Sequence, residues 1–250
     1  TLLACHSIGL INEKYLKRQN GLILWIVPSN QIYKQTYNHL KDRNDYYRQV
    51  IDVISGGRTL IKEKTDKFSK QDVEENLVIL MLMLPSANRQ NKETLKIFQD
   101  SSGFTDFFPN EDDFKGHKEL KEKFPNLDFF SEENEIFGTL IKSSLGNTLR
   151  TLKPVIIIDE GHKAYSEQAR KTIQNFNPCI LLELSATPPE NSNNLVNITG
   201  KELDREEMIK LDIHIINKTS LDWKNTLNAS WDFRNKLEET AIRYKQNTNV

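Results

Sequence analysis

Short apolar runs that end abruptly in polar residues constrain this chain more than any other feature of its sequence. Four of them stand out: LILWIV (22–27), NLVILMLML (76–84), VIII (155–158) and CILLEL (179–184). Unbroken apolar runs of this length are typical of strands that are covered on both faces in a parallel sheet. A fifth segment, GGRTLIKEK (56–64), indicates a shorter strand that is entered from a Gly-Gly turn.

Amphipathic segments alternate with these runs and predict helices. We expect helices over residues 1–18, 30–42, 131–152, 166–176 and 220–244, and one more strand or extended connector over 208–216. In the first helix, five residues recur at helical spacing and are expected on one side: Leu3, Ser7, Leu10, Ile11 and Tyr15. The alternation predicts an α/β fold with a mainly parallel sheet and helices on both faces.

Two features of the sequence are less regular. Residues 86–130 mix Phe with Pro and acids, which suits a loop-rich insertion packed by its aromatic rings. Cys5 and Cys179 lie in apolar stretches, without the number or spacing of a disulfide framework or a zinc site. We expect both cysteines to be small core residues.

The composition argues against a membrane protein. Apolar residues make up 37% of the chain and charged residues 28%, the mean hydropathy is -0.59, and the longest apolar run, Leu77 to Leu84, is too short to cross a bilayer. We therefore expect a cytoplasmic location. A net charge of -1 excludes a simple polycation but not a nucleic-acid-binding protein, because phosphate contacts need only a local basic or amide-lined surface.

The polar ends of the predicted strands should converge. In a parallel α/β sheet the ligand lies just beyond the carboxyl ends of the strands, so these ends share one rim. The segments placed there are Pro28-Ser29-Asn30, Pro85-Ser86-Ala87-Asn88, Asp159-Glu160-Gly161-His162 and Ser185-Ala186-Thr187.

Two adjacent carboxylates, Asp159 and Glu160, stand at the end of the third apolar run without a neighbouring Arg or Lys. They repel each other unless a cation lies near them. Hydrated Mg²⁺ suits such a pair, because it binds through few protein carboxylates and takes other oxygens from substrate phosphates. In phosphoryl transfer one acid can hold the metal shell while the other orients or deprotonates the attacking water. The pair therefore indicates a nucleotide-hydrolysis site.

Simpler interpretations exist for each residue taken alone. Acids after a strand also begin helices, where the helix dipole favours negative charge. The segment Ser185-Ala186-Thr187 has the form of an ordinary turn after a strand, and His162 that of a surface or packing histidine. The combination of these segments in one order favours the functional interpretation.

The motifs resemble those of a known family. VIIIDEGH resembles the Walker B element (motif II, DExH type) of superfamily 2 helicases, LSATPP resembles their motif III, and LWIVPSNQIYKQT resembles motif Ia. Within this superfamily of DEAD/DEAH-box proteins, IIDEGHKAYSEQAR, LELSATPP and EEMIKLDI are most similar to the Res (restriction) subunit of type III restriction enzymes. The resemblance covers residues 1–217 and implies a RecA-like P-loop NTPase domain that uses ATP and Mg²⁺.

The resemblance also implies catalytic roles. Asp159 would hold the Mg²⁺ shell, and Glu160 would be the base for the attacking water. His162 would report the nucleotide state to the coupling segment Ser185-Ala186-Thr187, which links hydrolysis to movement on nucleic acid.

Nucleic-acid contacts are implied at two further strand ends. Ser29, Asn30 and Gln31 would offer hydroxyl, amide and helix N-terminal N–H groups to phosphates, which position a strand without reading its sequence. Asn88 and Arg89 are candidates for the same role, although Arg89 is equally well explained as a solvated loop charge.

One expected motif is absent. The sequence holds no GxxxxGK[ST] phosphate loop. The family places GKT directly before a helix like LLACHSIGL, so Thr1 is either the last residue of a truncated P-loop, with its hydroxyl a Mg²⁺ ligand, or simply the end of the chain. We expect a fragment: residues 1–217 form the first RecA-like domain, and 218–250 form a helical linker toward an absent second one.

Three functions remain open from the sequence. The first is the initial motor domain of an ATP-dependent DNA helicase or translocase, with a second RecA-like domain and a methyltransferase (modification) subunit as expected partners, DNA rather than RNA as its track, and little activity as a fragment. The second is a non-catalytic nucleic-acid-binding or scaffolding module that keeps the fold without a P-loop. The third is another phosphate-handling α/β enzyme.

Overall fold

The computed structural model describes residues 1–83, 103–130, 140–161, 167–188, 192–206, 208 and 223–247. The chain divides into two compact units, Thr1–Asn193 and Asn194–Val250. The first unit contains a parallel sheet with its helices, and the described part of the second contains α8 (Gly200–Arg205) and α9 (Trp223–Asn247). Our domain boundary after residue 217 stays a prediction.

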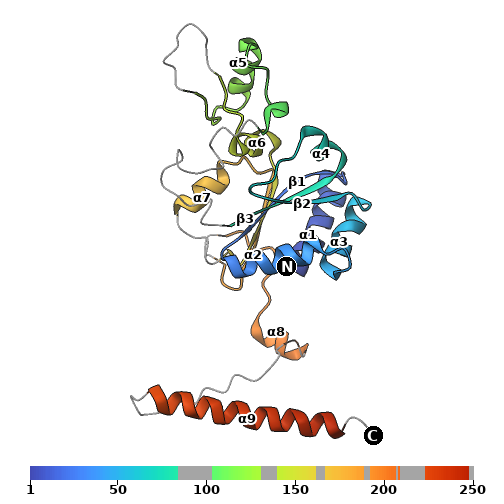
Figure 1. Ribbon diagram of the computed structural model, residues 1–250, viewed down its shortest axis with the longest axis vertical. Helices are drawn as coiled ribbons and strands as arrows, with labels where there is room; N and C mark the ends of the chain where they lie inside the picture. The colour runs from blue at the N-terminus through green and yellow to red at the C-terminus, as the bar shows by residue number, and fades with distance from the viewer. Residues whose placement is uncertain are drawn as a thin grey trace. The chain divides into compact units, whose positions relative to one another are not determined.

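A parallel sheet lies among the helices of the first unit (Figure 1). In the described part of the chain it has five strands, in the order β2-β3-β1-β4-β5. The predicted strands are confirmed at all five apolar segments, and so is the α/β fold class. The strands are β1 (Gly21–Val27), β2 (Thr59–Glu63), β3 (Leu77–Met83), β4 (Val155–Asp159) and β5 (Ile180–Leu184).

The register of the central strands brings their carboxyl ends to one edge. Ile26 of β1 pairs with Ile158 of β4, and Asp159 pairs with Leu184, the last residue of β5. Because the strands all run in the same direction, the residues that follow β1, β4 and β5 leave the sheet at the same rim. This arrangement is the one that the sequence predicted.

Three helices cover one face of the sheet: α1 (Leu2–Leu10), α2 (Asn30–Lys41) and α3 (Tyr46–Ser55). A π-helical turn, Ile11–Leu16, continues α1. The core on this face joins Ile8, Leu40 and Ile51 of the helices to Trp25 and Ile157 of the strands.

The expected side of the first helix is wrong at three positions, whereas Ile11 packs against the core on this face. Leu3, Leu10 and Tyr15 are 62%, 59% and 70% exposed, whereas Ala4 and Cys5 are fully buried. The small Ala4 and Cys5 side chains allow the helix to approach the sheet closely, so α1 turns this side toward the core instead of its leucines.

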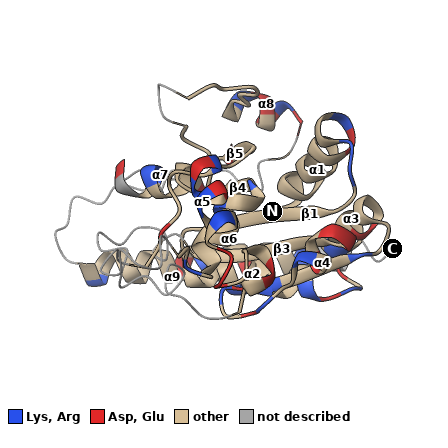
Figure 2. Cartoon of the chain, turned by 90° about the horizontal axis from the view of Figure 1, so that it is seen from above, with Lys and Arg blue, Asp and Glu red and all other residues tan. Residues whose placement is uncertain are grey.

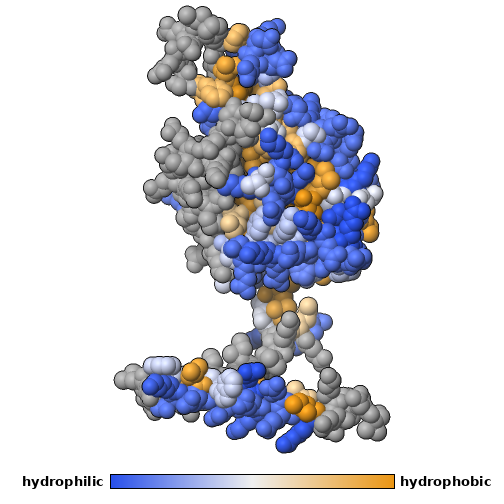
Figure 3. Space-filling model, viewed as in Figure 1, coloured by the Kyte–Doolittle hydropathy of each residue, from blue (hydrophilic) through white to orange (hydrophobic). Residues whose placement is uncertain are grey.

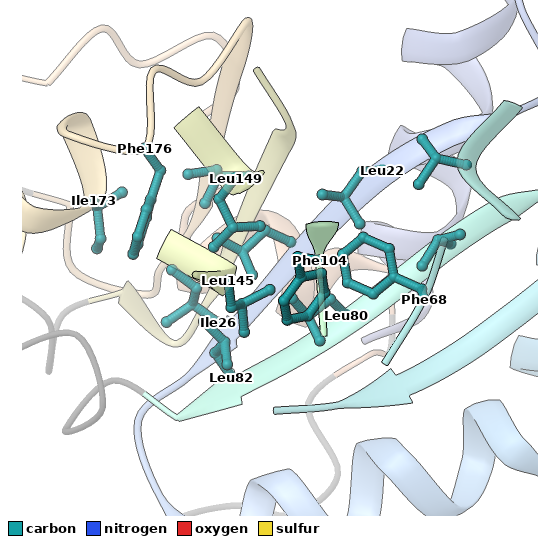
Figure 4. Packing of buried hydrophobic residues seen from close by; sticks show 14 of the residues in the cluster. Leu22, Ile26, Phe68, Leu80, Leu82, Phe104, Leu145, Leu149, Ile173 and Phe176 are labelled. Carbon is teal, nitrogen blue, oxygen red and sulfur yellow. The ribbon is translucent and has the colours of Figure 1, made fainter. Parts of the chain in front are cut away.

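The other face of the sheet is covered by α4 (Lys70–Glu75), α6 (Leu145–Leu152), α7 (Glu167–Gln174) and part of residues 103–130. Phe68 and Phe104 pack edge to face, with ring centroids 5.2 Å apart, against a core that contains Leu22 and Leu80 (Figure 4). The described part of the insertion is therefore packed by its aromatic rings, as predicted, although it also forms a 3₁₀ turn (Thr105–Phe107) and the helix α5 (Phe114–Lys123).

The predicted helix over 131–152 is shorter than expected. Residues 131–139 lie outside the described residues, and Ile141 forms an isolated antiparallel bridge with Phe129. The helix α6 begins only at Leu145, because the hydroxyl of Ser144 caps it by accepting a hydrogen bond from the backbone N–H of Asn147 at 3.2 Å. The helices α3, α4, α5 and α8 were not predicted.

A buried polar cluster fastens the insertion to the sheet layer. The guanidinium of Arg150, which is fully buried, donates to Oδ1 of Asn147 at 2.8 Å and forms an ion pair with Asp128 at 2.9 Å. Burial lowers the pKa of Arg150, and the charge of Asp128 counteracts this effect. The amide of Asn126 donates to the backbone carbonyl of Asn175 at 2.9 Å. These contacts join the insertion to the segment between β4 and β5.

Charge and hydropathy follow the layers of the first unit. The strands β1 and β3 carry no charged residue, and the charges gather on the helices (Figure 2). In the second unit, α9 confirms the predicted helix over 220–244, but its large apolar side chains are exposed (Figure 3). None of the helices in the described ranges is long and apolar enough to cross a membrane.

The contrast between central and edge strands gives a first prediction. Ile157→Ala removes a fully buried side chain from β4, and we expect it to lower the free energy of unfolding by about 2–5 kcal/mol, because the lost contacts leave a cavity. The matched variant Leu181→Ala, on β5, truncates a side chain that is 45% exposed and should cost well under half as much. Chemical denaturation of both variants measures the difference, and equal losses would contradict the assigned core.

Candidate functional site

The centre of the site is a contact between Thr1 and Asp159, two residues of the first unit that are far apart in the sequence. The hydroxyl of Thr1 donates a hydrogen bond to Oδ2 of Asp159 at 3.3 Å, across 158 positions of the chain. The backbone nitrogen of Thr1 lies 3.5 Å from the same oxygen. Ala4 and Cys5 pack α1 against the sheet, and this packing holds its first residue beside the end of β4.

Asp159 and Glu160 differ in their place relative to the sheet and in backbone conformation. Asp159 ends β4 and is only 8% exposed. Glu160 follows in the left-handed region, with φ of 56°, which costs a residue with a side chain about 1–2 kcal/mol. Strained backbone of this kind persists where the surrounding structure holds it, often at functional sites. The turn therefore sets the direction of the second carboxylate at a cost in backbone energy.

The residues present fit a hydrated Mg²⁺. Thr1 supplies a hydroxyl and Asp159 a carboxylate at hydrogen-bonding distance from each other, with Glu160 next in sequence. A hard cation that binds through few protein oxygens and keeps its waters suits this sparse oxygen set. No group of three His, Cys, Asp or Glu side chains that could hold a metal ion gathers among the residues that the structure describes, so the waters and the substrate would supply most of the ligands of a Mg²⁺ here.

The predicted nucleic-acid residues after β1 form the start of α2. The hydroxyl oxygen of Ser29 caps the helix by accepting from the backbone N–H of Ile32 at 3.4 Å. Asn30 and Gln31 are exposed, and the first turn of the helix holds no acid. A helix N-terminus of this kind favours an anion. The other two candidates, Asn88 and Arg89, lie outside the described residues.

The Ser-Ala-Thr segment follows β5 at the same edge of the sheet. The backbone N–H of Thr187 donates to the hydroxyl oxygen of Ser185 at 3.2 Å, which makes a tight turn, and Ala186 and Thr187 are exposed. His162 lies outside the described residues, so its predicted link to this turn stays a prediction.

The sequence analysis missed one residue beside the acid turn. Glu183 of β5 pairs with Ile158 of β4, and its side chain lies against Gly161. Burial raises the pKa of the Glu183 carboxyl, and its buried Oε1 atom has no hydrogen-bond partner in the described part of the chain. An acid within the otherwise apolar run CILLEL was the signal that could have identified it.

A surface hollow of about 290 Å³ lies elsewhere, between α4 and residues 103–106. Its polar groups already make local hydrogen bonds. The carboxylate of Asp106 accepts from the backbone N–H of Lys70 at 2.6 Å, and the hydroxyl oxygen of Ser69 caps α4 by accepting from the backbone N–H of Asp72 at 3.0 Å. None of the predicted site residues lines it.

The two cysteines differ in their surroundings. Cys5 is fully buried in the first turns of α1, and burial raises the pKa of its thiol to about 12. Cys179 is exposed, so the expectation that both are core residues is wrong for Cys179. It directly precedes β5, at the opposite end from the Ser-Ala-Thr turn.

Comparison with known families agrees with the fold. Residues 1–190 match the family described as type III restriction enzyme, res subunit. The matched range contains every strand of the sheet, both ends of the Thr1–Asp159 contact and the Ser-Ala-Thr turn. No curated protein matches the chain.

The contrast between the cysteines gives a second prediction. At pH 8 a thiol reagent such as dithionitrobenzoate should label Cys179 in the native protein and leave Cys5 unmodified, because Cys5 is buried and its thiol stays protonated far above neutral pH. Cys179→Ser should abolish labelling of the native chain. Denaturant should then restore one reactive thiol, and fast native labelling of Cys5 would contradict the packing of α1.

Proposed function

The chain belongs to the type III restriction enzyme res subunit family, and from this premise we propose that it is the first motor domain of an ATP-dependent DNA helicase or translocase. The family match and the parallel sheet make it a helicase-like, RecA-like ATPase domain. Hydrolysis of ATP and movement on DNA are the proposed part. The observation that supports it most is the contact between the Thr1 hydroxyl and the Asp159 carboxylate at the rim of the sheet.

Thr1 and Asp159 are the proposed ligands of the nucleotide's Mg²⁺. Their oxygens are 3.3 Å apart, and Asp159 is largely shielded from solvent, which strengthens its attraction for a cation. The cation, when bound, neutralises charge on the phosphates. The described site offers a metal shell but no amide cradle for the phosphates, which in this family the P-loop supplies.

Glu160 is the proposed base. Its carboxylate accepts a proton from water as the water oxygen bonds to the terminal phosphorus, while the bond from that phosphorus to the bridging oxygen breaks and ADP leaves. The chain turns at Glu160 through a left-handed backbone directly after Asp159, and we propose that the two acids serve different roles. His162 is proposed to sense the nucleotide state.

The nucleic-acid track is proposed to cross the N-terminus of α2. Ser29, Asn30 and Gln31 offer N–H and hydroxyl groups there without a nearby acid in the first turn, a pattern that suits phosphate contacts rather than base recognition. DNA is the proposed track because the family acts in restriction. Asn88 and Arg89 are proposed as further contacts.

The partners and the location also remain proposals. A motor of this type works with a second RecA-like domain of the same chain, which supplies the rest of the nucleotide site, and with a modification subunit that carries the methyltransferase. A cytoplasmic location follows from the same function.

Replacement of the base gives a third prediction. In the intact natural gene product, Glu160→Gln should keep Mg·ATP binding within about threefold but lower turnover by about a hundredfold or more, because the amide cannot accept the proton. Equilibrium binding of a fluorescent ATP analogue and DNA-stimulated phosphate release measure the two effects.

Glu122→Gln is the matched control for this prediction, since Glu122 is an exposed acid on α5. It should change neither binding nor turnover. Retained turnover in Glu160→Gln would refute the assigned base, and a wild-type protein that binds DNA without turnover would instead support a non-catalytic module.

The Ser-Ala-Thr turn gives a fourth prediction. Ser185→Ala combined with Thr187→Ala removes the hydroxyl that holds the turn and the exposed hydroxyl beside it. We expect ATP turnover within about threefold of wild type but loss of most strand displacement or translocation, because coupling and not chemistry depends on the turn. A triplex-displacement assay in parallel with phosphate release measures the ratio of steps to ATP. An unchanged ratio would count against the coupling role.

A further inference from the structure

Gly161 and Glu183 fill one space between them. A Cβ atom placed on Gly161 would lie 2.5 Å from Cγ, 2.7 Å from Oε1 and 2.8 Å from Cδ of Glu183. These distances are shorter than any van der Waals contact, so the carboxyl end of Glu183 occupies the position that a side chain at 161 would take. Glu183 belongs to β5, and Gly161 follows the neighbouring strand β4, in which Ile158 pairs with Glu183.

The backbone does not require the glycine. Gly21, Gly56 and Gly57 have positive φ angles, whereas Gly161 does not, so an alanine at 161 would meet no backbone strain. Gly161 is buried, and what excludes a side chain there is the Glu183 carboxyl. The glycine is therefore matched to the glutamate.

A contribution to the stability of the fold does not explain why position 183 holds a glutamate. Its Oε1 atom is buried without a hydrogen-bond partner in the described part of the chain, and burial disfavours its charged form. An unpaired buried polar atom of this kind destabilises the folded state. Costly groups that persist beside a site are candidates for a role in function.

The position of Glu183 gives it that role. Gly161 directly follows Glu160, the proposed base, and Ser185 lies two residues after Glu183 on the same chain. We propose that Glu183 is a positioning residue that packs against Gly161, fixes the turn carrying Glu160, and passes displacement of that turn to the Ser-Ala-Thr segment.

This inference rests on the proposed function. It adds to that function a residue, Glu183, that lies outside the recognised motifs. In this role Glu183 contacts neither the substrate nor the metal, and it acts only through the backbone of Gly161. Its loss should therefore lower turnover without weakening nucleotide binding, and without destabilising the fold.

The test compares variants of the intact gene product. Glu183→Ala and Gly161→Ala, which must push the carboxyl aside, should each lower kcat by about tenfold or more, since small displacements of a base have large effects on rate. The double variant should lose no more than the worse single variant, because both changes disturb the same contact. Glu183→Gln, which keeps the shape, should stay within about threefold of wild type.

Three further measurements separate positioning from a structural role. The unfolding midpoint of Glu183→Ala should equal or exceed that of wild type, and its affinity for a fluorescent ATP analogue should be unchanged. Amide hydrogen exchange at Glu160 and Gly161, measured without nucleotide, should become faster. Leu181→Ala, two positions earlier on β5, is the matched control. It should leave nucleotide affinity and amide exchange at Glu160 and Gly161 unchanged, and it should lower the unfolding midpoint only slightly, because its side chain is 45% exposed.

Several outcomes would overturn the inference. They are losses of kcat that multiply in the double variant, wild-type turnover in Glu183→Ala, or a lowered unfolding midpoint that accounts for the loss. If Gly161→Ala does not fold, the two Glu183 variants still decide the matter. A wild-type protein that neither binds nor hydrolyses ATP would reject the proposed function itself, whereas normal wild-type turnover with additive variants rejects only the role of Glu183.

Discussion

The shared direction and register of the strands is the constraint on which the site depends. Asp159 ends β4 opposite Leu184, the last residue of β5, and Ile26 of β1 is aligned with Ile158. Side chains that follow these strands therefore leave the sheet at one height, although they come from distant parts of the chain. The contact of the Thr1 hydroxyl with Asp159 needs one more condition, the close packing of α1 on the sheet through Ala4 and Cys5.

Two features at this rim have an energetic cost. The left-handed backbone of Glu160 and the buried, unpaired oxygen of Glu183 both disfavour the folded state. The apolar core on both faces of the sheet is large enough to tolerate them, since β1 and nearly all of β3 are buried on both sides.

The sequence predicted the structure correctly where the hydrophobic pattern of a segment decides whether it forms a strand. The four apolar runs and the segment after the Gly-Gly turn became the five strands of the described sheet. The prediction failed for the first helix, because either of two sides of this helix could have faced the sheet. Leu3 and Leu10 are more hydrophobic than Ala4 and Cys5, yet the smaller pair faces the sheet, because the distance between layers and not hydropathy selects the side that fits. The start of α6 was misplaced for a similar reason, since the bridge between Phe129 and Ile141 keeps the preceding residues extended.

By itself, the sequence determined the strands, their polar endings and the order of the helicase-like motifs, because these depend on local periodicity and on residue types at short spacing. Only the tertiary structure decided that Thr1 reaches Asp159, that Cys179 is exposed, and that Gly161 makes room for Glu183. Each of these depends on which residues of separate strands and helices come within a few ångströms of one another. That is set by packing between elements, which no local pattern in the chain encodes.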